Sequence, residues 1–310
     1  MSKYGLIPAK YFKVFDYHFG GISGITGEVL NPSGDWTSYL PVKEYQYGTF
    51  LDSMGCVTFS AMNCLEILFK RQYNVVYNFS DRFTAKLSDT TKNGNYLYKV
   101  GDAIRQYGLI EEQNWPFDRS MFDWDIYYAD IPTPLIADGK TFLAYTTVQY
   151  EFVSPNNTSL LNALQEAPLQ VTITYPNNNQ GGVFQRQEGQ EQHAVTLIKG
   201  LEGEPWEIFD TYNDTIKRLA WDYKFFTALK YNLSLKKLMA IPSNTLIQLI
   251  EGAGNFGLLV GDKLYVDDLA KITASWLVRN NGKVDGKVRA VKTADFNSWK
   301  HYNLKGEPTN

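Results

Sequence analysis

The sequence has no long apolar run and little excess charge, and both absences exclude whole classes of protein. No stretch approaches the roughly 18 apolar residues that a membrane span needs. The first residues, MSKYGLIP, lack the hydrophobic stretch of a secretory signal. The net charge of −3 gives no electrostatic reason to expect a nucleic acid or an anionic membrane as partner. We therefore expect a cytoplasmic protein that binds neither.

Cysteine and histidine are scarce, with two and three copies in 310 residues. Cys56 and Cys64 are separated by about 12 Å along the axis if they share a helix, which is too far for a disulfide. We expect a chain without disulfides, suited to a reducing compartment. The cysteines and histidines are widely scattered and show no zinc-ligand spacing, so we expect no metal and no cofactor.

The hydrophobic period changes along the chain. Apolar residues at helical spacing predict helices in the first half, whereas short alternating or apolar runs predict strands in the second. The predicted helices span residues 56–71, 81–87, 98–107 and 159–166, the strands span 169–175, 194–198 and 206–209, and residues 112–139 and 176–192 are predicted loops. Helices followed by strands favour an α+β domain of two halves, with an active site in the cleft between them.

The two ends of the chain differ in character from its middle. Residues 1–34 predict an irregular arm, and residues 35–242 carry the main domain. Within 243–310, an apolar stretch from Leu264 to Trp276 predicts a helix, and a basic segment follows from Arg279 to Lys292. That helix needs a surface for its apolar face. Either the tail packs on the main domain as an extension, or it is a docking module for a partner or a like subunit.

Three residues carry the strongest chemical signal. Cys56 opens the most regular predicted helix, where the dipole favours the thiolate, the form that attacks carbonyl carbon. His193 begins an apolar strand, and Asp210 ends the strand that follows. Adjacent antiparallel strands can bring these two side chains together, so that the carboxylate orients the imidazole. Taken singly, each also fits a plain structural role: a buried inert thiol, a solvent-facing strand histidine and a turn aspartate.

The order of the motifs resembles that of papain-like cysteine peptidases. Asp35-Trp36 and Pro41–Gln46 correspond to the family's DW and PVK-x-Q, and Gly55–Ser60 corresponds to its C-W-A-F-S region. His193–Val195 matches H-A-V and begins 137 residues after Cys56, within the roughly 130–150 given for this family. Further matches are Asn93–Tyr96 for N-G-G-Y, Trp115–Phe117 for Y-P-Y and Asp210–Tyr212 for N-S-W.

The resemblance covers residues 35–230 and implies an α+β, two-lobed papain-like fold with a helical left lobe, an antiparallel β right lobe and a C-terminal extension. It implies a thiol protease, a hydrolase that cleaves a peptide or protein substrate through a thioester on Cys56. His193 would be the base, Asp210 its orienting partner and Gln46 a side-chain donor to the oxyanion. The implied substrate-binding residues are Gly94, Asn95, Gln192 and Ala194. Trimmed members of this kind also suggest a bacterial or bacteriophage origin, with a virion-associated protein in the phage case.

Several positions depart from the family pattern. Val57 replaces the tryptophan after the nucleophile, Asn95 replaces a subsite glycine, and Asp210 stands where the family has asparagine. No pro-segment of family length precedes Asp35, so we expect control by compartment or partner instead of zymogen cleavage. Two alternatives stay open. One is a papain-fold structural or binding protein with weak or no peptidase activity, such as a phage component, and the other is a cysteine amidase acting on cell-wall peptides.

Overall fold

The structure is a computed structural model that describes residues 4–8, 27–212 and 216–236, and short strands of the tail between residues 245 and 302. The chain divides into two compact units, Met1–Gln72 with Val76–Leu235 and Tyr73–Val75 with Lys236–Asn310. We call them the main unit and the tail unit, and each is described by itself.

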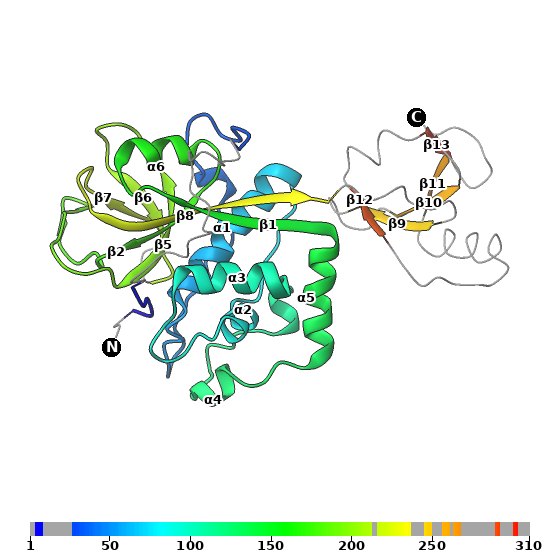
Figure 1. The fold of residues 1–310 in the computed structure, drawn as a ribbon, viewed down its shortest axis with the longest axis horizontal. Helices are drawn as coiled ribbons and strands as arrows, with labels where there is room; N and C mark the ends of the chain where they lie inside the picture. The colour runs from blue at the N-terminus through cyan, green and yellow to red at the C-terminus, as the bar shows by residue number, and fades with distance from the viewer. Residues whose placement is uncertain are drawn as a thin grey trace. The chain divides into compact units, whose positions relative to one another are not determined.

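One side of the main unit is helical (Figure 1). Its helices are α1 Cys56–Tyr73, α2 Asp81–Leu87, α3 Leu97–Tyr107, α4 Trp124–Tyr127 and α5 Thr133–Tyr145, with short 3-10 turns at Thr37–Tyr39 and Glu112–Asn114. None of the helices in the described ranges is long and apolar enough to cross a membrane.

Helix α1 is the central helix of this side. Every residue from Cys56 to Phe69 is buried, as expected for a helix that is packed on all faces. Its last turn carries Lys70 and Arg71, which donate to the carbonyl oxygens of Leu40 and Leu30 at 3.2 and 2.5 Å. Cations at this end also suit the negative pole of the helix dipole.

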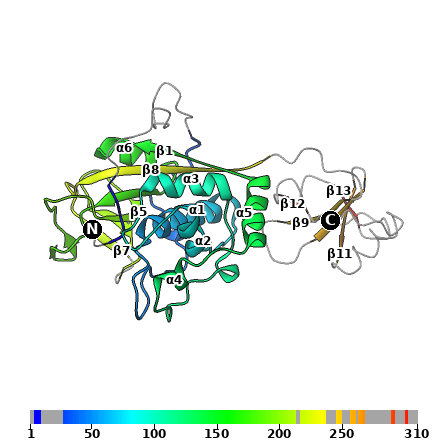
Figure 2. The ribbon, with the colours of Figure 1, turned by 60° about the horizontal axis from the view of Figure 1, so that its bottom comes forward.

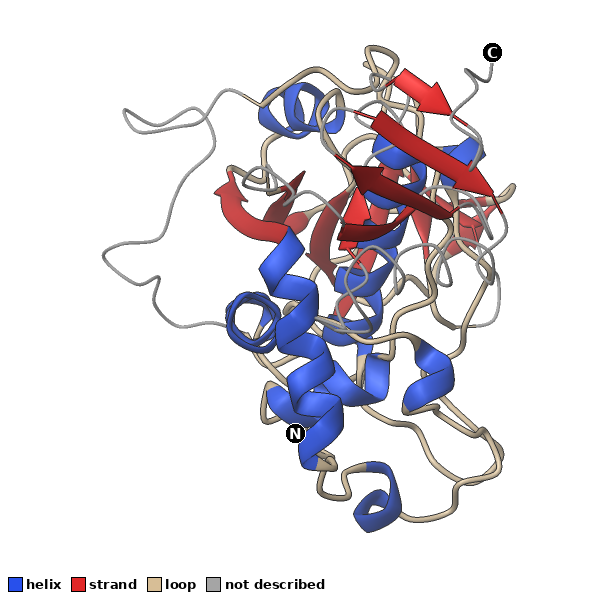
Figure 3. Cartoon of the chain, turned by 90° about the vertical axis from the view of Figure 1, so that its right-hand side faces the viewer, coloured by secondary structure: helices blue, strands red, loops and turns tan. Residues whose placement is uncertain are grey.

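The other side of the main unit is an eight-stranded sheet in the order β1-β8-β2-β5-β6-β7-β4-β3 (Figures 2 and 3). Its strands are β1 Thr146–Val153, β2 Leu169–Ile173, β3 Asn179–Gln180, β4 Val183–Phe184, β5 His193–Lys199, β6 Trp206–Phe209, β7 Ile216–Leu219 and β8 Phe225–Leu235, with α6 Asn157–Leu164 between β1 and β2. The β4–β7 pair is parallel and the other pairs are antiparallel.

Polar side chains of the sheet form hydrogen bonds with the start of α1. Gln170 on β2 is fully buried, and its Nε2 donates to the carbonyl oxygen of Val57 at 2.6 Å and to Ser60 Oγ at 2.9 Å. Thr196 on β5 donates to the carbonyl oxygen of Ser60 at 3.1 Å. Because the bonded groups lie within four residues of Cys56, these bonds fix the helix start against β2 and β5.

We expect Gln170→Ala to lower the free energy of unfolding by about 2–4 kcal/mol. The change removes both bonds to α1 and the bond that Tyr231 Oη donates to Gln170 Oε1 at 2.9 Å, and it leaves their buried partners unsatisfied. Equilibrium urea denaturation measures the difference. Gln149→Ala, at an exposed position of β1, is the matched control and should change stability by less than about 0.5 kcal/mol. Equal stability of the two variants would show that these bonds do not hold α1.

The predicted helices are confirmed, and both predicted loops are wrong in part. The loop predicted at 176–192 contains the short strands β3 and β4. Ser80 caps α2 by accepting from the Phe83 N–H, and α3 ends at Gly108, whose φ is +74°. The helix predicted at 159–166 is α6, shifted by two residues. The interpretation of 112–139 as a loop is wrong, because α4 and the first part of α5 lie there. A proline in the first turn of α5 removes no helical hydrogen bond, so it starts this helix instead of excluding one.

The predicted strands are confirmed as β2, β5 and β6, and the sheet adds strands that the sequence interpretation lacked. The longest of these are β1 and β8, which pair from Thr146↔Leu235 to Val153↔Ala228. The alternation of β2 does not give it a solvent-facing side, because every residue of β2 is buried. Its polar residues are bonded inside the protein instead: Thr172 Oγ1 donates to Glu191 at 2.5 Å.

The tail unit is described as a sheet in the order β12-β9-β10-β11-β13. Its strands are β9 Thr245–Leu249, β10 Phe256–Val260, β11 Lys263–Asp267, β12 Arg289–Val291 and β13 Lys300–Tyr302. The predicted helix is wrong from Leu264 to Asp267, because these residues form β11 and pair with β10. Its remainder up to Trp276 lies outside the described residues, as does most of the basic segment. Whether 243–310 is a docking module stays a prediction.

Candidate active site

Cys56 is the first residue of α1 and is fully buried. Burial raises the pKa of its thiol, and the carboxylates of Asp52 and Asp210 raise it further, although a backbone hydrogen bond from Ala194 lowers it. Burial of the thiol therefore opposes the formation of a thiolate that the start of a helix favours. The helix dipole is present, but desolvation outweighs it. Cys64 on the same helix is equally buried, and burial raises the pKa of its thiol too.

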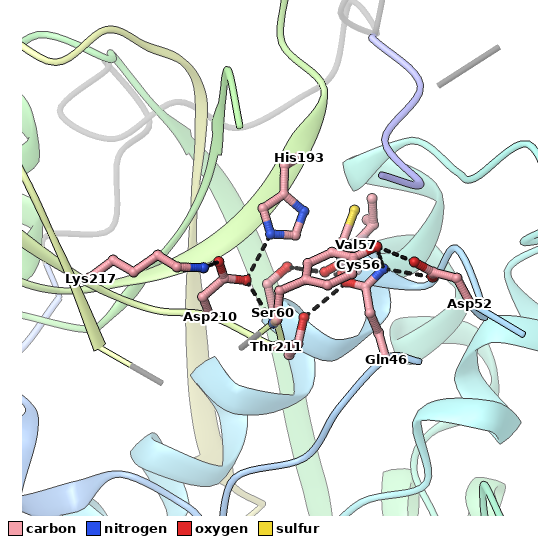
Figure 4. A network of polar contacts seen from close by, with 10 residues as sticks. Gln46, Asp52, Cys56, Val57, Ser60, His193, Asp210, Thr211 and Lys217 are labelled. Atoms are coloured by element: carbon pink, nitrogen blue, oxygen red, sulfur yellow. Dashed lines mark hydrogen bonds and ion pairs between the residues drawn. The ribbon is translucent and has the colours of Figure 1, made fainter. Parts of the chain in front are cut away.

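His193 and Asp210 form a buried pair, as the sequence predicts. His193 Nε2 lies 2.8 Å from Asp210 Oδ1, and neither side chain is exposed. Because the His193 side chain is fully buried, a solvent-facing His193 is excluded. The second ring nitrogen, Nδ1, has no hydrogen-bond partner among the described residues. In Figure 4 this nitrogen points toward the side of the ring on which Cys56 lies.

The charge of Asp210 is compensated on both of its oxygens. Burial by itself would raise the pKa of this carboxyl, but His193 and Lys217 beside it lower the pKa to about 2. Lys217 on β7 makes an ion pair with Oδ2, and the Tyr212 N–H donates to Oδ1 at 3.2 Å. An ionised carboxylate only accepts hydrogen bonds. The proton between the pair therefore sits on His193 Nε2.

Gln46 lies beside this pair, and its whole amide is engaged (Figure 4). Oε1 accepts from Thr211 Oγ1 at 2.9 Å, and Nε2 donates to Tyr212 Oη at 2.9 Å and to Asp52 Oδ1 at 3.1 Å. Tyr212 Oη in turn donates to the second oxygen of Asp52. A role for Gln46 as oxyanion donor would require Nε2 to leave one of these acceptors.

Residues Tyr4–Pro8, which we call the N-terminal segment, pair with the backbone of Asn95. The Asn95 N–H donates to the Gly5 carbonyl oxygen at 2.8 Å, and the Ile7 N–H donates to the Asn95 carbonyl oxygen at 2.7 Å. These bonds form a parallel bridge centred on Leu6, whose side chain is 1% exposed. The segment is therefore held by its backbone against a predicted substrate-binding residue.

Gly94 allows this close approach. Its φ is +91°, and an added Cβ would lie 2.0 Å from the Gly5 carbonyl oxygen. A side chain at Gly94 would therefore be strained and would also displace the N-terminal segment.

The same segment covers the predicted base and adjoins the predicted nucleophile. Tyr4 stacks on Tyr175 with ring centroids 4.1 Å apart, and its centroid lies 5.9 Å from that of His193. A Cβ added at Gly5 would lie 2.2 Å from the carbonyl oxygen of Met54, two residues before the nucleophile. Cys56 and His193 are both fully buried in this arrangement.

The structure brings most of the predicted site residues together, while their roles stay predictions. The four predicted catalytic residues, Cys56, His193, Asp210 and Gln46, lie at one end of α1 and of β5 and β6. Of the four predicted substrate contacts, Gly94 and Asn95 adjoin the N-terminal segment, Ala194 bonds the thiol, and the Gln192 N–H donates to the Ile173 carbonyl oxygen at 3.0 Å. Within the described ranges, no group of three or more acidic, His or Cys side chains is suited to a metal ion.

The sequence interpretation missed Asp52, Lys217 and Tyr4. Lys217 had a usable signal, because alternation places it on the same face as Leu219, and both are buried on β7. Asp52 stands in a loop before Cys56 and has no local pattern that marks it. Tyr4 reaches the site only through the docking of a distant segment, which no local pattern reports.

Comparison with solved structures identifies the fold. Xylellain, a cysteine protease from Xylella fastidiosa, aligns with a TM-score of 0.56 at 15% identity, over 77% of this chain and 97% of its own. Digestive procathepsin L 3 from the larval midgut of Tenebrio molitor aligns with a TM-score of 0.50 at 16% identity, over 66% of this chain and 71% of its own. The fold is papain-like.

The papain-like fold confirms the predicted α+β architecture, with a helical lobe and an antiparallel β lobe. No protein-family model and no curated protein matches the sequence. Likeness at such low identity establishes the papain-like fold alone.

Proposed function

We propose that the chain is a cysteine peptidase, with Cys56 as nucleophile, His193 as general base and acid, and Asp210 as the group that orients His193. One observation carries the proposal. The Cys56 thiol accepts a hydrogen bond from the backbone of Ala194, and His193 is the residue before Ala194. His193 Nδ1 has no hydrogen-bond partner among the described residues, and His193 Nε2 is hydrogen-bonded to Asp210. A thiol, a free ring nitrogen and an orienting carboxylate are the parts that nucleophilic acyl transfer needs.

The proposed reaction has two steps. Cys56 Sγ attacks the carbonyl carbon of a peptide bond, and the thiol proton passes to His193 Nδ1. The carbon–nitrogen bond then breaks, Nδ1 protonates the leaving amine, and a thioester remains on Cys56. Water attacks the thioester, and His193 takes the water proton and returns it to the sulfur as the carbon–sulfur bond breaks. Asp210 stabilises the imidazolium that forms in each step.

Oxyanion stabilisation is proposed for the Cys56 backbone N–H and the Gln46 amide. The first N–H groups of a helix have no partner inside the helix, so that of Cys56 is suited to this role. Gln46 Nε2 is at present bonded to Asp52 and Tyr212. Its contribution therefore requires a local rearrangement when substrate enters.

The N-terminal segment supports an extended peptide as the substrate. It pairs with Asn95 through both an N–H and a carbonyl oxygen, which is how an added strand is recognised irrespective of its side chains. Leu6 shows in addition that an aliphatic side chain can be buried beside Asn95. Because the segment closes the site, substrate binding requires it to leave. Its departure admits water and weakens the burial that raises the pKa of the Cys56 thiol.

Labelling with an epoxysuccinyl peptide, followed by peptide mapping in a mass spectrometer, tests this function. We expect the label on Cys56 and none on Cys64, and we expect His193→Ala to abolish labelling because the thiol loses its proton acceptor. Equal labelling of both cysteines, or labelling that does not depend on His193, would favour the alternative of a papain-fold binding protein. Parallel assays on peptide and cell-wall amide substrates separate a peptidase from an amidase.

A further inference from the structure

Lys217 is a buried lysine behind the His193–Asp210 pair (Figure 4). It is 4% exposed, its Nζ makes an ion pair with Asp210 Oδ2, and Nζ lies 5.3 Å from the ring centroid of Tyr175. The other oxygen of Asp210 is the one that His193 Nε2 approaches to 2.8 Å. A single carboxylate therefore joins an ammonium group on one side to the imidazole on the other.

A buried ammonium group requires an explanation, because its desolvation costs several kcal/mol unless it is paired and hydrogen-bonded. Without Lys217, the buried charge of Asp210 would be balanced only while His193 is protonated. With Lys217, Asp210 is balanced in both protonation states of His193. The imidazole can then gain and lose a proton without leaving an uncompensated carboxylate beside it.

We propose that Lys217 is a positioning residue, which holds Asp210 ionised and in place through both states of His193 and offsets the field of Asp210 at the Cys56 thiol. The inference rests on the proposed function and adds a residue to it. Lys217 acts through Asp210 and touches no reacting atom. Asp210 and Lys217 together present His193 with an acceptor of no net charge. This accounts for a carboxylate at a position where the resembling family has an asparagine.

Several ionisable groups surround His193 and bear on this assignment. They are Cys56 on α1, Tyr175 after β2, Asp210 and Tyr212 after β6, Tyr4 of the N-terminal segment, and Asp52 behind Tyr212. Two of these groups are carboxylates, and Lys217 supplies a positive charge against them. Removal of that charge leaves a field that opposes formation of the thiolate and favours the imidazolium.

The pH dependence of Cys56 labelling by an epoxysuccinyl peptide tests the proposal. Lys217→Met keeps the apolar stem and removes the charge, and we expect the acidic limb of the rate profile to move up by about one pH unit. Lys217→Arg keeps the charge and should leave the limb in place. Asp210→Asn by itself leaves the Lys217 ammonium group without an anionic partner and should move the acidic limb to lower pH. The double variant Asp210→Asn/Lys217→Met removes both charges and should return the limb toward its original position.

Lys230→Met is the matched control. Lys230 is a buried lysine on β8 of the same sheet, 0% exposed and 2.8 Å from Glu151 Oε1. It lies five residues along β8 from Phe225, which pairs with Ile173, the partner of His193. That separation is roughly 16 Å along the strand. Its loss should lower stability and leave the acidic limb in place.

The outcomes separate this inference from the proposed function. An acidic limb that stays in place in Lys217→Met, or that moves equally in Lys230→Met, overturns the positioning role while the peptidase proposal stands. A shift without rescue in the double variant also overturns it, because compensation between the two charges is the claim. Absence of Cys56 labelling in the unsubstituted chain instead overturns the proposed function.

Discussion

Cys56→Ser should leave no measurable peptide hydrolysis, a loss on the order of 10⁴-fold or more. The substitution keeps the size of the side chain and puts a hydroxyl at the start of α1, against the backbone of Ala194. A hydroxyl is a weaker nucleophile than a thiol and needs stronger activation by its base. Steady-state hydrolysis of a fluorogenic peptide amide measures the loss, and a thermal melt checks that the fold is retained.

Cys64→Ser is the matched control for this experiment. Cys64 lies on the same helix and is equally buried, but it bonds Thr196 and has no contact with the His193–Asp210 pair that the structure records. Its replacement should leave the rate of hydrolysis unchanged. Retained hydrolysis in Cys56→Ser would refute the assignment of the nucleophile, whatever the behaviour of Cys64→Ser.

Leu6→Asp should raise the rate at which iodoacetamide alkylates Cys56 by at least roughly tenfold. Burial of the Leu6 side chain contributes about 1.5–3 kcal/mol to holding the N-terminal segment in place, and the two backbone bonds to Asn95 contribute about 1 kcal/mol each. A carboxylate cannot occupy the same buried position without a charged partner. The segment should therefore leave the site, and mass spectrometry follows the modification of Cys56 with time.

Val42→Asp provides the comparison for a charge placed at an exposed apolar residue. Val42 is 77% exposed, so its replacement disturbs no buried contact. In this variant, iodoacetamide should alkylate Cys56 at the same rate as in the unsubstituted protein. If the two aspartate variants react at the same rate, the N-terminal segment does not limit access to Cys56, and the site opens by another route.

The proposed catalytic residues could be expected to lie near one another because each is marked by a local pattern. Cys56 follows a glycine and precedes a long stretch free of glycine and proline, so the start of α1 is visible in the sequence. His193 and Asp210 lie at the ends of two apolar runs with a short connection between them. Short connections favour antiparallel neighbours, and the register Thr196↔Phe209 brings the two side chains to the same edge.

The remaining parts of the site depend on contacts that no local pattern reports. The N-terminal segment reaches Asn95 across about 90 intervening residues. The burial that opposes thiolate formation at Cys56 likewise depends on tertiary packing and not on the local sequence. Short apolar runs are ambiguous between helix and strand. In the tail, Gly261-Asp262 separates two such runs, and this hairpin signal should have favoured the strands β10 and β11 over a helix.

The position of the site in the sheet has a consequence for the order of folding. Strand β2 is held between β8 and β5, and β8 joins residues 225–235 to β1 at 146–153. Helical contacts are local and form early, whereas pairings between distant segments must first overcome the entropy of closing a long loop. During synthesis, α1 is complete before the strand that carries His193 has been made. A nascent chain therefore holds its thiol without the proposed proton acceptor, and the proposed activity can arise only when the sheet has closed.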